Sequence, residues 1–456
     1  MTGLRDYVLV AVLGGLVPAS LIRPWVGVLG WFWIAYMVPH SLTWGFGRNL
    51  PVAALVGGAT LAGFLFTKDR RPLPRSGTMF LVLLFFAHIT LSSALAFNPE
   101  LAWVKWESVS KILLMTLVTL CLFQERARLR YLYLVPALCL GFYGLKSGIW
   151  VLRTGGASRL FGPERSFFED NNTFGLALGM VLPLLLCLSR EESRPWLKRL
   201  LRVMFAGTIV AVLFTYSRGA FLGLAVVLAV VIWRSPWRLR FATVVVVATL
   251  IGAPLLPTAL KSRIASISDQ ESAETRDRSS SGRIEAWHTA WGIAVAHPFF
   301  GEGFKALWNT DLWNTYYGND YLAVRDVHSL YFEVLSEHGI LGFLIYLAIL
   351  LGTFNSLRRV RKRWRDDPEH GYLSRYADMT QLALWPYLIA GAFLGVAYFD
   401  LYFLLVGTGI LLSQLSVEAE AVSRATNPIP ANRVSESRRK GLLATGRQAH
   451  QRPRHA

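Results

Sequence analysis

The sequence predicts an all-helical protein that crosses a membrane about twelve times and carries one large loop outside it. Of its 456 residues, 53% are apolar and only 17% are charged, and the mean hydropathy is +0.39. Soluble domains do not have this balance. Apolar runs recur along the chain, and each approaches or reaches the ~20 residues that a helix needs to span a bilayer. A soluble enzyme is therefore excluded.

The spans can be placed one by one along the chain. The candidate runs lie near residues 6–22, 25–39, 50–66, 78–96, 107–123, 131–152, 171–189, 203–216, 219–233, 241–256, 329–354, 380–397 and 399–415. If all of them cross fully, Met1 and the C-terminus lie on opposite sides of the membrane. One short or re-entrant segment before Pro39 would instead return Met1 to the side of the C-terminus. We favour this second alternative, with twelve crossings.

The net charge of +18 is concentrated in short loops, where it indicates topology and not a nucleic-acid partner. One set of alternate loops holds 30 Lys and Arg residues; they are 67–77, 124–130, 189–202, 234–240, 355–378 and the tail from 416. The other set holds 13; they are 40–49, 97–105, 153–170, 217–218 and 257–326. The positive-inside rule places the first set in the cytoplasm.

Four regions follow from this topology. Residues 1–256 form N-terminal membrane helices, 257–326 a large periplasmic loop, and 327–415 the C-terminal membrane helices. The last region, 416–456, is a basic cytoplasmic tail that we expect to be disordered, because it has few large apolar residues.

Arg218 interrupts an otherwise apolar stretch from Val203 to Trp233. A single helix through this stretch would put the basic loops on its two sides in different compartments, so the sequence favours a hairpin with Arg218 at its tip. Arms of about 14 residues would be roughly 21 Å long, shorter than a ~30 Å bilayer core. The tip should then lie below the outer surface, where a charged residue is costly and indicates function. A capping or snorkelling arginine is the alternative.

Arg283 lies in the predicted periplasmic loop, after Ser281 and Gly282. Either of these residues could cap a helix, which would put Arg283 in the first turn, where backbone N–H groups and the helix dipole favour an anion. The apolar residues of this helix recur on one face; they are Ile284, Trp287, Trp291, Ala294 and Val295. This pattern predicts an amphipathic helix on the membrane surface. A phosphate site and a simple interfacial anchor both fit Arg283.

His328 begins the next predicted span, with Asp326 as a possible N-cap. On a continuous helix, Gly339 and Gly342 fall within about 20° and 40° of the face of His328. Their missing side chains leave room beside the imidazole, where a helix or a lipid chain could pack. An interfacial histidine without a catalytic role is the alternative.

Other polar residues near the predicted outer surface have simpler explanations. Asn171 and Asn172 head the span at 171–189, where they either cap the helix or line a polar entrance for a sugar. Glu333 and Glu337 face away from His328, which indicates structural or pairing roles. Phosphate-binding loops and clustered metal ligands do not occur as sequence motifs, so phosphate chemistry would depend on arginines. We expect no cofactor and no metal ion.

Together, these residues resemble the bacterial O-antigen ligase family. The similarity lies in the pattern H-S-x9-G-x2-G from His328 to Gly342, the Ser217-Arg218-Gly219 turn, the Gly282-Arg283 step and the segment Pro-Phe-Phe-Gly-Glu-Gly at 298–303. It covers roughly residues 160–415. Upstream, residues 23–25 and 39–45 are similar to members described as O-glycosylation ligases associated with exosortase systems.

The resemblance implies a glycosyltransferase at the outer face of the bacterial inner membrane. Its donor would be a glycan on undecaprenyl diphosphate, and its acceptor the lipid A-core of lipopolysaccharide. Arg218 and Arg283 would bind the diphosphate, and His328 would act as general base in a direct, inverting displacement. Asn171, Asn172, Gly339 and Gly342 would line the substrate site.

Three alternatives stay open from the sequence. A protein O-glycosylation ligase or an O-antigen polymerase would use the same residues on another acceptor. A transporter of lipid-linked sugars would also use arginines at membrane depth, although the chain lacks a visible internal repeat of the kind found in carriers. Neither the acceptor nor the oligomeric state can be inferred from the sequence.

Overall fold

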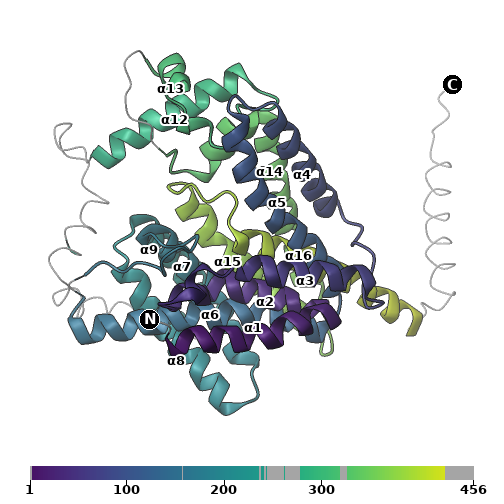
Figure 1. Cartoon of the computed structure of the whole chain (residues 1–456). Helices are drawn as coiled ribbons and strands as arrows, with labels where there is room; N and C mark the ends of the chain where they lie inside the picture. Colours follow the sequence, from purple (N-terminus) through teal and green to yellow (C-terminus); the bar gives the residue numbers. More distant parts are fainter. Residues whose placement is uncertain are drawn as a thin grey trace, which may run out of the picture. The chain divides into compact units, whose positions relative to one another are not determined.

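The computed structural model describes residues 3–156, 158–235, 238–240, 243, 261, 278–318 and 326–426. Every regular element among them is a helix (Figure 1). The helices are α1 Leu4–Ile22, α2 Pro24–Met37, α3 Val52–Phe66, α4 Gly77–Ala94, α5 Pro99–Leu122, α6 Arg126–Thr154, α7 Asn171–Glu191, α8 Pro195–Phe214, α9 Arg218–Trp233, α12 Arg278–Ala296, α13 Thr310–Tyr316, α14 Leu330–Arg363, α15 Gly371–Gly391 and α16 Asp400–Thr426. Short 3₁₀ turns occur at Pro39–Leu42, Phe46–Asn49 and Ala306–Trp308.

The all-helical class is confirmed, and six of the described helices are long and apolar enough to cross a membrane; they are α1, α4, α6, α7, α14 and α16. Helices α2, α3 and α9 are apolar but shorter. The predicted span at 241–256 lies outside the described residues, apart from residue 243. The chain divides into two compact units, Met1–Gln414 and Leu415–Ala456. In the second unit the helix continues to Thr426, so the first part of the predicted tail is helical.

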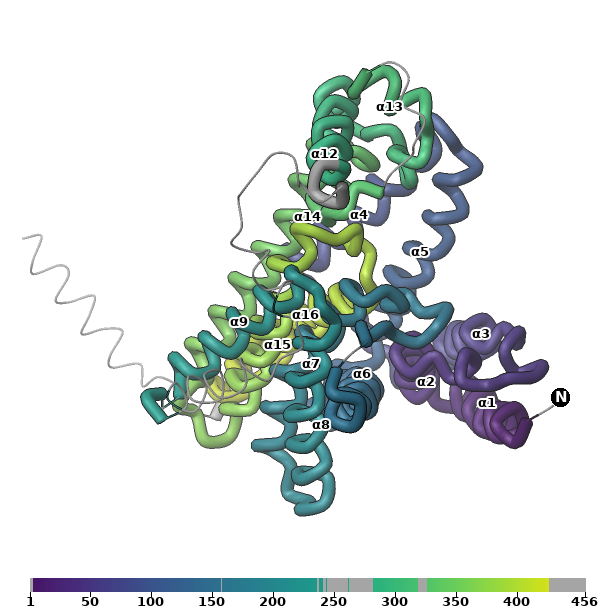
Figure 2. The backbone as a smooth tube through the Cα atoms, turned by 90° about the vertical axis from the view of Figure 1, so that its left-hand side faces the viewer, coloured from purple at the N-terminus to yellow at the C-terminus, as the bar shows by residue number. Residues whose placement is uncertain are grey.

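Helix α7 is the most buried of the candidate spans, and it packs against α6, α8, α9 and α15 (Figure 2). Glycines allow close packing of the neighbouring α6 and α8. A Cβ atom added at Gly148 would lie 2.6 Å from the carbonyl oxygen of Gly207, and one added at Gly144 would lie 2.1 Å from Oγ1 of Thr208. Close backbone approach through small residues is the usual way in which membrane helices gain packing energy.

Helix α15 differs from its predicted position. The apolar run at 380–397 predicted a helix there, but the helix covers Gly371–Gly391. Residues 392–399 form an irregular connection in which Leu394, Val396 and Ala397 are buried. Their apolar character therefore reflects burial inside the protein and not a position in a membrane helix.

The loops of each predicted set gather together. Loops with many basic residues are joined by ion pairs, namely Arg128–Asp69, Arg130–Glu192, Arg375–Glu191 and Arg234–Asp378. Loops of the other set and the helix ends beside them contact one another; the contacts are Arg48–Glu164, Arg165 Nη1 to Asn49 Oδ1, Phe97 N to Glu302 O, Leu160 N to Phe214 O and Asn171 Nδ2 to Thr215 O. The charge count and the packing thus group the loops in the same way.

The start of α1 belongs to the second group. The Asp6 carboxylate accepts a hydrogen bond from the Gly47 amide at 2.7 Å. The Arg5 guanidinium donates to the carbonyl oxygen of Leu42 at 3.0 Å and lies 4.3 Å from the ring centroid of Trp44. These contacts place the first turn of α1 against the loop at 40–49.

Candidate functional site

Arg218 is the first residue of α9, and the predicted hairpin of α8 and α9 is confirmed. Ser217 is the N-cap, and its Oγ accepts a hydrogen bond from the Ala220 amide. Tyr216 has a left-handed backbone (φ 57°), an unfavourable conformation that tends to occur at functional sites.

The hairpin arms are longer than predicted. Helix α8 has 20 residues and α9 has 16, which correspond to about 30 Å and 24 Å. Only α9 is therefore short of a full bilayer core. The length of α9, but not that of α8, is consistent with a hairpin tip below the outer surface of the membrane. The Arg218 side chain is half-buried.

Arg283 lies in the second turn of its helix, because α12 begins at Arg278 and not at Gly282. The argument that Arg283 meets an anion at a helix N-terminus is therefore wrong. The side chain is half-buried. Any role in anion binding must come from the guanidinium itself and not from the helix dipole.

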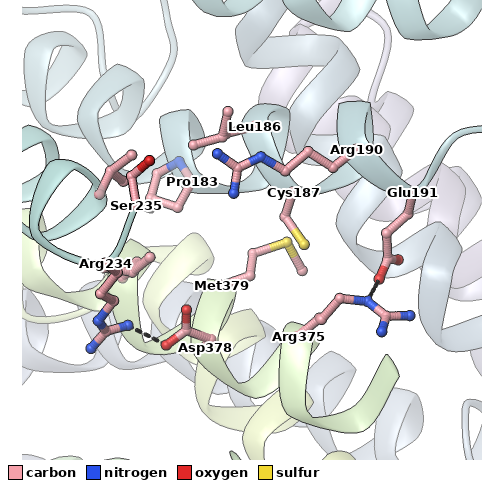
Figure 3. A pocket seen from close by; sticks show the side chains of 12 residues that line it. Pro183, Leu186, Cys187, Arg190, Glu191, Arg234, Ser235, Arg375, Asp378 and Met379 are labelled. Carbon is pink, nitrogen blue, oxygen red and sulfur yellow. Dashed lines mark hydrogen bonds and ion pairs between the residues drawn. The ribbon is translucent and has the colours of Figure 1, made fainter. Parts of the chain in front are cut away.

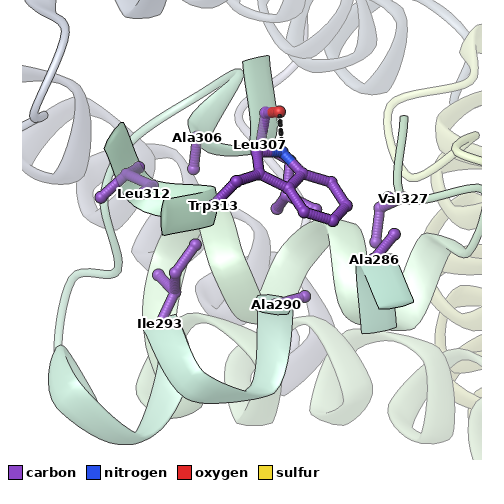
Figure 4. Close-up of a cluster of buried hydrophobic side chains, with 8 residues drawn as sticks. All are labelled: Ala286, Ala290, Ile293, Ala306, Leu307, Leu312, Trp313 and Val327. Atoms are coloured by element: carbon purple, nitrogen blue, oxygen red, sulfur yellow. Dashed lines mark hydrogen bonds between the residues drawn. The ribbon is translucent and has the colours of Figure 1, made fainter. Parts of the chain in front are cut away.

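Helix α12 buries part of the apolar face that was predicted to lie on a membrane. Trp287 stacks on Phe332 with ring centroids 5.3 Å apart, and Ala294 is buried. Only Ile284, Trp291 and Val295 of that face are exposed. The buried core between α12, α13 and neighbouring turns consists of Ala286, Ala290, Ile293, Ala306, Leu307, Leu312, Trp313 and Val327 (Figure 4).

His328 precedes the helix that it was predicted to begin. Helix α14 starts at Leu330 with Ser329 at the N-cap position, so Asp326 is not the cap. His328 is exposed and has a left-handed backbone (φ 43°). The Asp326 cap and the shared helical face of His328, Gly339 and Gly342 were both predicted from a helix that begins at His328. Both predictions are wrong, because His328 is not part of α14.

Gly339 and Gly342 contact protein and not open space. Gly339 has φ 70° and ψ −178°, which breaks α14 into two segments. A Cβ atom there would lie 2.6 Å from the carbonyl oxygen of Pro298, and one at Gly342 would lie 2.8 Å from Nε2 of His88. The predicted close packing at these glycines is confirmed, but the atoms that pack there belong to the segment around Pro298 and to His88 of α4.

The segment 298–303 is hydrogen-bonded to the break in α14. The amides of Glu302 and Gly303 donate to the carbonyl oxygens of Ser336 and Glu337 at 3.1 and 2.9 Å, and the Leu341 amide donates to Pro298 O at 3.0 Å. These bonds satisfy backbone groups that the interrupted helix leaves open. The family-like motifs at 298–303 and 328–342 thus form one structural unit.

Replacing Gly339 by alanine is expected to lower the midpoint of thermal unfolding more than replacing Gly155. Gly155 has nearly the same φ, 67°, but a Cβ atom there would have nothing within 4 Å. Both substitutions carry the ~1–2 kcal/mol of a left-handed alanine, and Gly339→Ala adds roughly 1–3 kcal/mol of overpacking. Unfolding in detergent, followed by intrinsic fluorescence, measures the difference; equal losses would contradict it.

A buried polar network adjoins this unit, and the sequence predicted its pairing character but not its partners. Glu337 accepts hydrogen bonds from the Lys305 amide at 2.8 Å and from the Tyr398 hydroxyl at 2.6 Å. Glu333 accepts from the Ala397 amide at 3.0 Å. These bonds confirm that the two glutamates are pairing groups.

Ser92 on α4 joins that helix to the segment 298–303 and to α14, a contact that the sequence did not predict. Its Oγ lies 2.7 Å from Phe300 O, 2.9 Å from Glu337 O and 2.8 Å from Nδ1 of His338. A serine in an apolar helix was the available signal, since polar side chains at membrane depth join helices.

Burial raises the pKa of Glu302, in the same segment 298–303, and His297, whose Nε2 lies 2.8 Å from the Glu302 carboxylate, opposes this effect.

Asn171 and Asn172 occupy the first turn of α7. The Asn171 side chain is buried and donates to the carbonyl oxygen of Thr215 at 2.8 Å, which holds the turn before Arg218. The Asn172 amide donates to the carboxylate of Asp170, the N-cap of α7, at 2.8 Å. Asp170, and not either asparagine, caps the helix.

The C-terminal end of α15 contacts the elements that carry two of the predicted site residues. A Cβ atom on Gly219, which follows Arg218, would lie 3.3 Å from Cα of Ala390. The next residue, Gly391, packs against the side chain of Leu330. A Cβ atom added at Gly391 would lie 2.0 Å from Cδ2 of Leu330. The start of α9 and the start of α14 therefore meet on adjacent residues of α15.

Helix α12 also approaches the C-terminal end of α15, through Trp287, which lies one turn after Arg283. Its indole stacks at a tilt on Phe393, with ring centroids 6.4 Å apart. Its Nε1 donates to the carbonyl oxygen of Val327 at 2.9 Å, next to His328. The structure thus brings together α12, which carries Arg283, the start of α9, where Arg218 lies, and the start of α14, which follows His328.

A pocket of about 430 Å³ lies at the other end of α7 and does not include these residues (Figure 3). Arg234 pairs with Asp378 and Arg375 pairs with Glu191, so the ion pairs join α7, α9 and α15. Arg190 also lines the pocket and is exposed. The paired charges indicate a structural role for this end of the bundle.

Comparisons with known proteins match two segments. Residues 203–347 match a family described as O-Antigen ligase. Residues 4–192 match a family of unknown function, so the upstream resemblance to O-glycosylation ligases carries no assigned activity. No curated protein matches the sequence. The segment that matches the O-antigen ligase family contains all three predicted site residues and the break at Gly339, and the match confirms the resemblance that the sequence motifs predicted.

Proposed function

We propose that this multi-pass membrane protein is a glycosyltransferase that moves a glycan from undecaprenyl diphosphate to the lipid A-core of lipopolysaccharide. The observation that carries the proposal is the meeting of α9, α12 and α14 at the end of α15. This meeting supports a common site for Arg218, Arg283 and His328 within the segment that matches the family.

The proposed orientation puts this neighbourhood in the periplasm. The loops with few basic residues gather at this end of the bundle, as the positive-inside rule requires of the outer side. Since the first turn of α1 contacts the loop at 40–49, we now favour thirteen crossings over twelve. The predicted span at 241–256 and the first part of the predicted loop, 257–277, lie outside the described residues, apart from residues 243 and 261.

The proposed reaction is one displacement at the anomeric carbon. The acceptor hydroxyl oxygen forms a bond to that carbon while the carbon–oxygen bond to the diphosphate breaks, and the leaving diphosphate takes the electron pair. Two guanidiniums can bind a diphosphate bidentately and stabilise its growing charge. The hydroxyl proton passes to the imidazole of His328. Attack opposite the leaving group inverts the anomeric centre.

The test is transfer from a defined lipid-linked glycan, with core lipopolysaccharide and an acceptor peptide offered together to the full-length protein in vesicles. We expect label on the lipopolysaccharide. Label on the peptide would replace the proposal by protein O-glycosylation, and label on a lengthened lipid-linked glycan would replace it by polymerisation. Movement of the donor across the membrane without transfer would identify a transporter.

Chelation is expected to leave this activity unchanged, because guanidinium groups supply the positive charge that stabilises the leaving diphosphate. Initial rates with and without EDTA in the same vesicles measure the effect. Inhibition that Mg²⁺ or Mn²⁺ reverses would contradict the arginine-based mechanism.

A further inference from the structure

The exposed side of α6 carries a groove of about 520 Å³ that the proposed mechanism does not use. It is lined by Phe142, Leu145, Lys146, Ser147, Ile149, Trp150 and Arg153 of α6, and by Leu160 and Phe161 of the following loop. The volume is within the ~300–1,000 Å³ usual for small-molecule sites.

The charge in this groove is positive and uncompensated. Lys146 and Arg153 are both exposed, and within the described ranges neither has a hydrogen-bond or ion-pair partner. The carboxylates of the following loop are engaged elsewhere: Glu164 pairs with Arg48, and Glu169 accepts from a backbone amide. Asp170 caps α7. An anion would therefore be attracted to the groove.

The rest of the lining is apolar and aromatic. The aromatic side chains of the groove form an apolar surface beside Lys146 and Arg153. Their exposed fractions are 40% for Phe142, 54% for Trp150 and 59% for Phe161. Lys146 lies eight residues before the end of α6, about 12 Å along the helix axis, within a candidate span. A cation at that depth beside an apolar groove fits a ligand with an anionic head and a hydrocarbon chain.

The wall of the groove is attached to the turn that carries Arg218. The Leu160 amide donates to the carbonyl oxygen of Phe214 at 3.1 Å, and the Tyr216 hydroxyl donates to that of Gly156 at 2.9 Å. The loop that lines the groove is therefore hydrogen-bonded to the turn that precedes α9.

We propose that the groove is the site where a polyprenyl diphosphate donor first binds from the membrane, before its diphosphate reaches Arg218 and Arg283. In this first position the diphosphate lies on Lys146 and Arg153, and the first isoprene units lie on the aromatic side chains. The inference rests on the proposed function, since it takes the donor to be a lipid-linked diphosphate. A snorkelling Lys146 explains one cation, but it does not explain a second unpaired cation seven residues further along the same cavity.

The test uses the full-length protein in phosphatidylcholine nanodiscs. The measured quantities are the Kd for undecaprenyl diphosphate without a glycan, and kcat and KM for the glycan-linked donor. Lys146→Ala combined with Arg153→Ala should raise Kd and KM about tenfold or more, because two charge-assisted contacts are lost. The kcat should change less than about twofold, because the groove does not contact the reacting atoms.

Two matched variants separate charge from structure. Lys146→Arg with Arg153→Lys keeps both charges and should retain the wild-type Kd. Arg190→Ala removes an exposed arginine from the pocket at the other end of α7 (Figure 3) and should leave Kd and KM unchanged. An effect of Arg190→Ala as large as that of the groove variants would overturn the inference.

The remaining outcomes are also decisive. Unchanged Kd and KM in the alanine double variant would overturn the inference while wild-type transfer upheld the proposed function. Displacement of the probe by an equal concentration of phosphatidylglycerol would make the groove a general anionic-lipid site and would also overturn it. Binding through Lys146 and Arg153 without transfer to any acceptor would support the groove and overturn the proposed function.

Discussion

Replacing His328 by alanine is expected to lower kcat by about 10²–10⁴-fold, the usual contribution of a general base, and to leave donor binding nearly unchanged. The imidazole would take a proton from the acceptor and would not hold the diphosphate, so its loss acts on the chemical step. Single-turnover transfer in vesicles measures the rate, and equilibrium binding of the donor measures the affinity.

His288→Ala is the matched control for this prediction. His288 is also exposed, lies on α12, and packs edge-on against Tyr317 with ring centroids 6.3 Å apart. We expect it to keep the wild-type rate. If His328→Ala instead weakened donor binding and kept kcat, the histidine would be a binding residue and the general-base role would be wrong.

Arg218→Ala and Arg283→Ala are each expected to lower kcat/KM by about 10²–10³-fold, as the loss of one group that stabilises developing negative charge does elsewhere. Lysine at either position should restore only part of the rate, because an ammonium keeps the charge but not the bidentate geometry. Arg202→Ala, an exposed position on α8 at the far end of the same hairpin, should have no effect.

A double-mutant cycle makes the arginine prediction sharper. If both guanidiniums bind one diphosphate, the double variant should lose much less than the product of the two single losses, because groups that act as a unit are not additive. Purely additive free-energy changes would show that the two arginines act independently. In that case Arg283 would be an anchor of α12, the alternative that the sequence left open.

The sequence predicted the helical elements well where the boundary carried charge. The α8–α9 hairpin followed from the basic loops at 189–202 and 234–240, because membrane topology is decided by such charges. The sequence did not predict the bounds of α15, because hydropathy measures only the preference for an apolar environment and does not distinguish the membrane from the protein interior. The connection at 392–399 satisfies that preference by burial within the protein.

The candidate site was harder to predict, because its geometry depends on a few backbone angles. Gly339 was expected to be a small residue on a continuous helical face, but its φ of 70° ends that face. A glycine's φ cannot be read from one sequence, since glycine adopts both signs readily. Arg283 lies in the second turn because α12 begins at Arg278, before the Ser281 and Gly282 that fit a cap.

The break at Gly339 has a consequence for engineering this protein. Ser336 and Glu337 accept hydrogen bonds from the amides of Glu302 and Gly303, and Trp287 of α12 is hydrogen-bonded to Val327. Both ends of the segment 327–338 are therefore attached to residues that precede α14 in the chain. A chimera that exchanges acceptor preference between homologues should accordingly have its downstream junction after residue 342, since a junction at residue 326 would separate His328 from the scaffold that positions it.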